Sequence, residues 1–177
     1  MYSDDKSKFN MVLLEKDGLT YKTYPGEEEL MKIIDLMKEE LSEPYPIFTY
    51  RYFVNLWPDC NILVYDKDKF IGCIIGKCER NKNKKMKGYI AMIAVDKSYR
   101  GKKVGRILTS LFIDKMKEYK AHEVTLETEV TNTAALGLYE SVGFVRSRIM
   151  LNYYLNGNDA YKLKLWLNNF EEELENK

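Results

Sequence analysis

Hydrophobic positions change their spacing along the chain, and these changes mark helical and extended segments. From residue 27 the apolar residues recur every three or four positions, which predicts an amphipathic helix that begins after Pro25-Gly26 and ends before Pro44. The aromatic segment 48–57, which is followed by Pro58, predicts a second and shorter helix. The loop of residues 42–47 between the two helices is a candidate wall of a binding site.

Three extended runs follow, at residues 61–65, 70–78 and 88–95, and they predict an antiparallel meander. A short polar turn at residues 66–69 joins the first two runs. The link before the third run, residues 80–87, carries five basic residues in eight. We interpret this link as a solvated hairpin tip, and contact with ribosomal or other RNA is the alternative.

The second half of the chain alternates helices with strands. A helical stripe runs from Val104 to Met116, and residues 123–130 then place their apolar side chains on one face, as a half-buried strand does. A further helix over residues 133–142 stops at Gly143, which suits a C-terminal cap. Strand, helix and strand in this order imply a right-handed parallel crossover, so we expect a mixed α/β fold.

The end of the chain predicts a β-hairpin and a tail. Residues 144–155 and 160–167 are typical of strands, and Asn156-Gly157 between them is a strong turn signal. Residues 168–177 form an acidic tail. The length of 177 residues corresponds to about one domain, so we expect residues 1–177 to form a single domain.

Composition and charge exclude several classes of function. The chain has 28 Lys and Arg against 27 Asp and Glu, with a net charge of +1, so no overall field draws it onto DNA or an anionic membrane. Its longest apolar run, residues 89–95, is far shorter than the roughly 20 residues of a membrane helix. Residues 1–6 lack the apolar core of a signal peptide. We therefore expect a soluble, cytoplasmic protein.

Three cysteines and one histidine give no metal or disulfide pattern. Cys60, Cys73, Cys78 and His122 do not have the spacing of zinc ligands, so no metal is expected. A cysteine nucleophile paired with the histidine is formally possible. Inert buried thiols are the interpretation we favour, because Cys73 and Cys78 lie in an apolar, strand-like run.

Residues 99–106 form a cationic, glycine-containing loop between a strand and the first turn of a helix. Free backbone N–H groups and the positive end of the helix dipole favour an anion there, and Arg100, Lys102 and Lys103 add full charges. The loop therefore suits a phosphate group, although it is neither a Walker loop nor a dinucleotide fingerprint. An ordinary solvated helix start is the alternative.

Two further features carry candidate chemistry. Glu127 and Glu129 are two residues apart on one strand, so both project from the face opposite its apolar residues, roughly 7 Å apart. Such a pair suits proton transfer, and two solvent-facing acids are the alternative. Asn132 and Tyr139 lie two turns apart on one face of the following helix, where the Tyr139 phenol is either a proton donor or a packed core aromatic.

Taken together, these residues resemble the GNAT acetyltransferase family. The family's phosphate loop reads Arg/Gln-x-x-Gly-x-Gly/Ala, and Arg100 and Gly105 match its first and last positions. Lys103 stands where the family has its first glycine. We expect Lys103 to be helical, which avoids left-handed strain and lets its ammonium meet a phosphate. The resemblance implies the GNAT fold, a mixed sheet of about six to seven strands splayed between the fourth and the fifth, flanked by about four helices.

Four separated blocks resemble, more narrowly, the NatC-type catalytic subunits of this family: residues 43–53, 88–92, 126–130 with Asn132, and 153–157. This resemblance implies transfer of acetyl from acetyl-CoA to the α-amino group of proteins that retain Met before a bulky hydrophobic residue. It also implies a hetero-oligomer with a large auxiliary subunit and a small Sm-like subunit. Nascent protein N-termini would be acetylated at the ribosome.

The resemblance also assigns roles to individual residues. Glu127 is the expected general base and Tyr139 the expected acid, while a backbone N–H near residues 93–95 meets charge on the acetyl oxygen. The expected contacts of acetyl-CoA are Ile93, Ala94, Val95, Arg100, Gly101, Lys102, Lys103, Val104, Gly105, Asn132 and Tyr139. The expected contacts of the peptide, beneath the final hairpin, are Glu43, Tyr45, Tyr89, Tyr153 and Tyr154.

Two other functions compete with this one. The first is a GNAT enzyme that acetylates another amine, such as a lysine, a ribosomal protein terminus or a polyamine. The second is a non-catalytic subunit that only binds acyl-CoA. The presence of both Glu127 and Tyr139 argues against the second, because CoA binding alone needs no acid and base.

Overall fold

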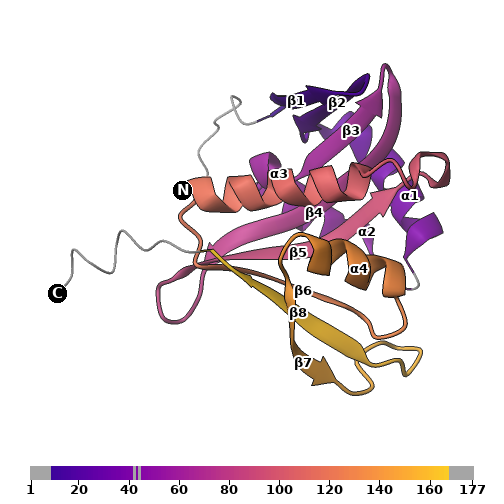
Figure 1. Cartoon of the computed structure of the whole chain (residues 1–177). Coiled ribbons are helices and arrows are strands. Elements are labelled where there is room, and N and C mark those ends of the chain that lie inside the picture. Colours follow the sequence, from indigo (N-terminus) through magenta and orange to yellow (C-terminus); the bar gives the residue numbers. More distant parts are fainter. Residues whose placement is uncertain (1–8, 42, 44, 168–177) are drawn as a thin grey trace.

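The computed structural model describes residues 9–41, 43 and 45–167, and this part of the chain forms one eight-stranded sheet (Figure 1). The strand order is β1-β2-β3-β4-β5-β6-β8-β7. Neighbouring strands are antiparallel except β5 and β6, which are parallel. The strands are β1 (Val12–Lys16), β2 (Leu19–Thr23), β3 (Ile62–Asp66), β4 (Lys69–Arg80), β5 (Met86–Val95), β6 (Glu123–Glu129), β7 (Val145–Met150) and β8 (Ala160–Trp166).

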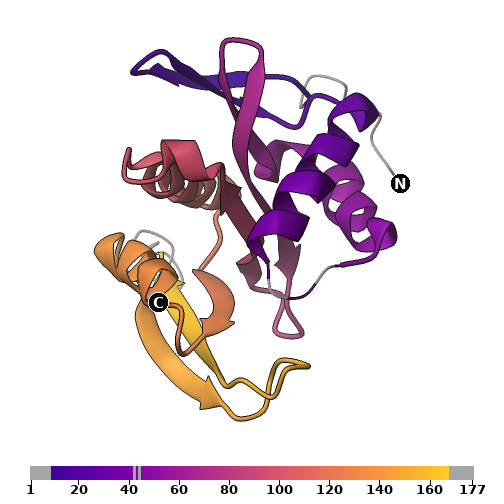
Figure 2. The same cartoon turned by 90° about the vertical axis from the view of Figure 1, so that its right-hand side faces the viewer.

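Helices cover both faces of the sheet. Figure 2 shows α1 and α2 on one side of the strands, and α3 and α4 on the other. None of the helices in the described ranges is long and apolar enough to cross a membrane. The helices are α1 (Leu30–Glu40), α2 (Ile47–Leu56), α3 (Val104–Glu118) and α4 (Thr133–Ser141), with short 3-10 turns at Glu27–Glu29, Pro58–Cys60 and Lys97–Tyr99.

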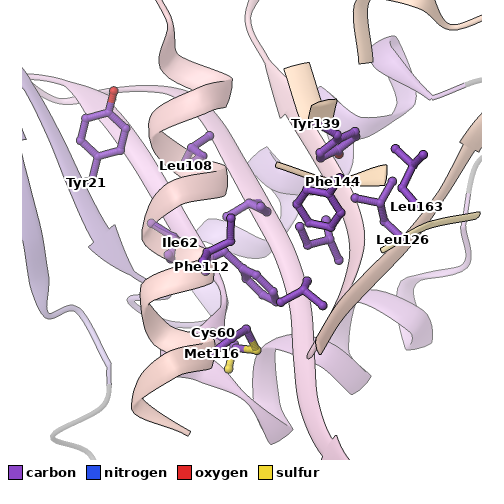
Figure 3. Close-up of a cluster of buried hydrophobic side chains, with 14 of the residues drawn as sticks. Tyr21, Cys60, Ile62, Leu108, Phe112, Met116, Leu126, Tyr139, Phe144 and Leu163 are labelled. Carbon is purple, nitrogen blue, oxygen red and sulfur yellow. The ribbon is translucent and has the colours of Figure 1, made fainter. Parts of the chain in front are cut away.

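The core beneath α3 depends on glycines in the strands that it covers. Leu108, Phe112 and Met116 of α3 are fully buried and point toward the sheet (Figure 3). A Cβ built on Gly76 of β4 would lie 2.6 Å from the Phe112 ring, and one on Gly88 of β5 would lie 2.6 Å from the Met116 sulfur. The helix therefore packs closely on the sheet because these two strand positions have no side chain.

A buried asparagine joins α2 to the sheet on the opposite face. Asn61 is fully buried, and its side-chain nitrogen donates to the carbonyl oxygens of Phe53 and Trp57 at the end of α2. Its side-chain oxygen accepts from the Gly76 N–H of β4 at 2.9 Å. One side chain thus satisfies two carbonyls at a helix end and one strand amide that would otherwise be buried without partners.

The sheet divides between β5 and β6. Their parallel pairing covers only Lys87–Glu123, Gly88–Val124 and Tyr89–Thr125, after which β5 has no ladder partner on that side. The register of β5 against β4 also shifts between Ile90 and Met92, which marks a bulge at this point. This divergence is the splay expected from the family resemblance, between β5 and β6 in the numbering of this chain.

Most predicted elements are confirmed. The first two helices are α1 and α2, the meander is β3-β4-β5, and the parallel crossover is β5-α3-β6. The basic link is an exposed hairpin tip of residues 81–85. The three cysteines are free and buried, as expected of inert thiols. The acidic tail at residues 168–177 lies outside the described residues.

Two predictions about hairpins differ from the structure. The described sheet has eight strands where about six to seven were expected, because residues 12–23 add a two-stranded hairpin around Asp17-Gly18 that the hydrophobic pattern did not indicate. The Asn156-Gly157 turn does not join β7 to β8 directly. Strand β7 ends at Met150, and Asn156-Gly157 is a local turn in which the Gly157 N–H donates to the Tyr154 carbonyl, within a longer loop.

Candidate active site

A cavity of about 650 Å³ lies where β5 and β6 diverge. Its walls are residues 89–95 of β5 on one side and residues 126–139 of β6 and α4 on the other. The α1–α2 loop and the β7–β8 loop add Glu43, Tyr45, Tyr153 and Tyr154 to this lining. The predicted site residues that line this cavity are Glu43, Tyr45, Tyr89, Ile93, Ala94, Val95, Arg100, Gly105, Glu127, Asn132, Tyr139, Tyr153 and Tyr154.

Four of the residues predicted to contact acetyl-CoA do not line the cavity: Gly101, Lys102, Lys103 and Val104. The Val104 side chain belongs to the core beneath α3, so only its backbone can face a ligand. The Lys102 ammonium lies 4.8 Å from the centre of the Tyr99 ring. These residues flank the cavity at the start of α3 and do not form its wall.

The expected conformation of Lys103 is wrong. Lys103 is the N-cap of α3 with φ 62° and ψ 13°, which is the left-handed region that the expectation excluded. The backbone therefore keeps the conformation that the family's glycine favours, and the lysine bears a cost of roughly 1–2 kcal/mol. The reason is the geometry of the turn, because the chain must reverse between residue 101 and the first turn of α3.

The start of α3 fits an anionic group. The side chain of its N-cap residue, Lys103, does not cap the first N–H groups, and the sequence places Arg100, Lys102 and Lys103 just before them. The edge of β5 beyond Tyr89, where the pairing with β6 ends, fits a ligand that carries amide groups. The Asp96 N–H donates to Ile71 of β4, so by alternation the Ile93 and Val95 N–H groups point the other way, into the gap. CoA has both matching features, because it carries phosphates at one end and amide groups along its pantetheine chain.

Glu127 is held from two sides. The Tyr89 hydroxyl donates to its Oε2 at 2.8 Å, and the Lys162 ammonium lies 3.6 Å from its Oε1. Its side chain is only 11% exposed. Glu129 has a different role, since its Oε2 accepts from the Asn158 side chain at 3.2 Å and so supports the β7–β8 loop. Both carboxylates line the cavity, and Glu127 is the one that the Tyr89 hydroxyl and the Lys162 ammonium hold there.

Tyr139 is both a core residue and a cavity residue. It is 4% exposed, and its ring packs edge-on against Phe144 with the ring centres 5.6 Å apart (Figure 3). Burial raises the pKa of the Tyr139 phenol. The group therefore stays protonated across the neutral range, and its hydroxyl is available as a hydrogen-bond donor. Asn132, the N-cap of α4, accepts from the Ala135 N–H and fixes the start of the helix that carries Tyr139.

Four tyrosines and one glutamate surround the other end of the cavity. The Tyr153 and Tyr154 rings meet edge-on with their centres 5.1 Å apart. Burial raises the pKa of Tyr45, Tyr89, Tyr153 and Tyr154, so all four are neutral hydroxyls that can bond a peptide backbone. The Glu43 carboxylate accepts from the Leu155 N–H and joins the α1–α2 loop to the β7–β8 loop at this end.

Sequence reasoning missed two charged residues of the site. Lys162 faces Glu127 directly across the β6–β8 ladder, and only the strand register brings the two together. Glu40, at the end of α1, lines the cavity and forms an ion pair with Arg100. No local pattern points to either residue, because each gains its place from a strand or helix distant in sequence. Tyr89, expected to hold peptide, also positions Glu127.

The fold and this site define an acyl-CoA-dependent acetyltransferase. The family model described as Acetyltransferase (GNAT) family matches residues 30–144, which is more than half of the chain. The chain therefore belongs to the GNAT family of acetyltransferases.

The relatives that it is similar to are N-alpha-acetyltransferases of that family. It is 44% identical to N-alpha-acetyltransferase MAK3 of Arabidopsis thaliana over 92% of this chain and 82% of that protein. It is 46% identical to N-alpha-acetyltransferase 30 of Xenopus laevis over 85% of this chain but only 55% of that protein, so it spans about half of this longer relative. A chain of the NatC complex bound to Gag peptide and CoA superposes with a TM-score of 0.82 at 43% identity, covering 85% of this chain and 99% of that one.

Proposed function

We propose that this protein is the catalytic subunit of a NatC-type N-terminal acetyltransferase. It transfers the acetyl group of acetyl-CoA to the α-amino group of proteins that retain Met before a bulky hydrophobic residue. One observation carries the proposal: Glu127 and Tyr139 line a single cavity, together with Arg100 and Gly105 on either side of the α3 N-cap and with the tyrosines Tyr45, Tyr89, Tyr153 and Tyr154. The sequence relatives named above support the choice of substrate class.

Glu127 acts as the general base. A peptide α-amine has a pKa of about 8, well below the roughly 10.4 of lysine, so a modest base such as a carboxylate can deprotonate enough of it at neutral pH. The Tyr89 hydroxyl on Oε2 and the Lys162 ammonium near Oε1 fix the Glu127 carboxylate toward the cavity. The proton leaves the amine for Glu127, directly or through a water molecule.

Tyr139 acts as the general acid. When bound, acetyl-CoA supplies a thioester whose carbonyl carbon accepts the amine and whose sulfur leaves as a thiolate. The buried, protonated Tyr139 phenol is available to donate to that sulfur. The Ile93 and Val95 N–H groups that face the gap donate to the acetyl oxygen and stabilise its developing charge.

The tyrosine end of the cavity selects a chain terminus. Hydroxyls of Tyr45, Tyr89, Tyr153 and Tyr154 hold the backbone of the first residues, and their rings contact the Met and the apolar second side chain. The hydrogen bond from the Leu155 N–H to the Glu43 carboxylate joins the two loops that carry these tyrosines. In this proposal the two joined loops admit a free N-terminus more readily than a lysine within a folded chain.

We propose the same assembly and place of action as expected from the sequence. The likeness to a chain of the NatC complex supports a hetero-oligomer with auxiliary subunits, of which a large one and a small Sm-like one are proposed. Because the substrates are protein N-termini, action in the cytoplasm on nascent chains at the ribosome is part of the proposal.

A peptide panel tests this function. The recombinant chain, alone and with its auxiliary subunits, is given acetyl-CoA and peptides that begin Met-Leu, Met-Ile, Met-Phe, Ser or Ala, and release of the CoA thiol is measured. We expect kcat/KM for the Met-initiated peptides to exceed the others by roughly 10- to 200-fold. Preference for a lysine or a polyamine would favour the other-amine alternative. CoA binding without turnover on any peptide, with the auxiliary subunits present, would favour a non-catalytic subunit.

A further inference from the structure

Glu40 is an acidic residue in a cavity that suits a polyanion. It is the last residue of α1, and its carboxylate forms an ion pair with the guanidinium of Arg100. The Glu40 side chain is 12% exposed, whereas that of Arg100 is 54% exposed. Both residues line the cavity near the start of α3. The arginine expected to meet the phosphates of CoA is therefore already held by a carboxylate of this chain.

Hydrogen bonds compensate only part of the cost of burying the Glu40 carboxylate. One carboxylate oxygen, Oε1, is buried and has no hydrogen-bond partner among the described residues. A half-satisfied buried carboxylate is costly. Its place at the C-terminal end of α1 is also unfavourable, because the helix dipole is negative there. The neighbouring Glu39 is exposed, so an acid at the end of this helix can avoid the cavity. Helix stability does not explain why Glu40 lies there.

We propose that Glu40 competes with the phosphates of CoA for Arg100. This inference rests on the proposed function and concerns the same site. A phosphate at Arg100 draws on the same guanidinium that now holds Glu40, and the Glu40 carboxylate then lies close to the bound anion. Glu40 thereby weakens CoA binding and favours its release after each turnover. It is a positioning residue that acts through Arg100.

Binding of CoA to four variants tests the proposal. Isothermal titration with CoA compares the wild-type chain with Glu40→Gln, Arg100→Gln, the double variant, and Glu39→Gln as the matched control. We expect Glu40→Gln to bind CoA roughly two- to fivefold more tightly, which is the upper part of the range of a partly exposed ion pair. The gain should vanish when Arg100 is also replaced, and Glu39→Gln should bind as the wild type does.

Steady-state kinetics separate this role from a structural one. In Glu40→Gln we expect KM for acetyl-CoA to fall with the Kd for CoA, while KM for the Met-Leu peptide stays the same. Because the substitution removes a charge from the negative end of α1, the variant should fold at least as stably as the wild type. This is checked by thermal unfolding.

Each outcome decides a different claim. CoA binding by Glu40→Gln that is no tighter than wild type overturns the inference, as does a gain that persists without Arg100. Wild-type chain that binds no CoA, even with its auxiliary subunits, refutes the proposed function itself. If Glu40→Gln does not fold, Glu40→Asp provides the test: it keeps the charge but shortens the reach to Arg100, and equal CoA affinity in Glu40→Asp and wild type overturns the inference.

Discussion

Lys103 offers a quantitative test of the loop at the start of α3. Its φ of 62° and ψ of 13° place it in the left-handed region, which costs a residue with a Cβ roughly 1–2 kcal/mol. Glycine removes that cost but loses more conformational entropy on folding, about 0.5–1 kcal/mol. We therefore expect Lys103→Gly to be more stable than Lys103→Ala by about 0.5–1 kcal/mol. Both variants lose the same charge and side chain, so their difference isolates the Cβ.

The adjacent Lys102 is the matched control. It is exposed like Lys103, but it is not among the residues with positive φ. At this position glycine gains nothing from the backbone, so Lys102→Gly should be less stable than Lys102→Ala by about 0.5–1 kcal/mol. The order of glycine and alanine thus reverses between two neighbouring lysines.

Thermal and urea unfolding of the four variants, without CoA, measure the effect. For a chain of 177 residues, 1 kcal/mol corresponds to roughly 2–4 °C in Tm, so each pair should differ by about 1–4 °C in opposite directions. If the alanine variant is more stable than the glycine variant at both positions, the left-handed conformation of Lys103 is refuted. That result would support the helical conformation predicted from the sequence.

Four further variants test the site and the core. Glu127→Gln should lower kcat at least about 100-fold with CoA affinity unchanged by titration; retained turnover would move the base to Glu129 or to water. Tyr139→Phe should lower kcat more than it raises KM. If Tyr139→Phe changes only KM, its role as acid is contradicted. Since burial raises the pKa of Tyr139 above its usual value of about 10, wild-type kcat should show no alkaline fall from this group below about pH 10. Gly76→Ala should destabilise by about 1–3 kcal/mol in urea unfolding, because its Cβ would lie 2.4 Å from the Tyr89 carbonyl oxygen; Gly137→Ala on α4, with no atom within 4 Å, is the control and should not destabilise. Asn61→Ala should cost about 2 kcal/mol or more by losing three buried hydrogen bonds, and a smaller loss would mean that water replaces them.

The sequence predicts those parts of the fold that depend on local periodicity. The stripes of α1 and α3 place their apolar residues on the sheet, and the alternation of β6 buries Leu126 and Thr128, because side-chain direction follows directly from helix and strand geometry. The missed β1–β2 hairpin carries a recognisable signal. Asp17-Gly18 is a favoured two-residue turn, and Gly18 has φ 78° as such a turn requires.

Contacts between distant segments could not be predicted in the same way. The family motif indicates Glu127 and Arg100, but not that Lys162 lies opposite the first or that Glu40 binds the second. Those neighbours depend on strand register and on where α1 ends above the sheet. Lys103 shows a related limit, because residue type favours an ordinary backbone while the turn demands a left-handed one, and the turn decides.

The position of Glu127 follows from where the sheet divides. Tyr89 is the last residue of β5 that pairs with β6, and its partner there is Thr125, two residues before Glu127. Beyond that pair the strands separate, so the backbone no longer holds β6 to β5. The hydrogen bond from the Tyr89 hydroxyl to Glu127 spans the gap at this point. It holds Glu127, the base that we propose, in the wall of the cavity that the β5 residues Ile93 and Val95 also line. The divergence that opens room for a ligand is therefore also what places this carboxylate and the unpaired part of β5 around one cavity.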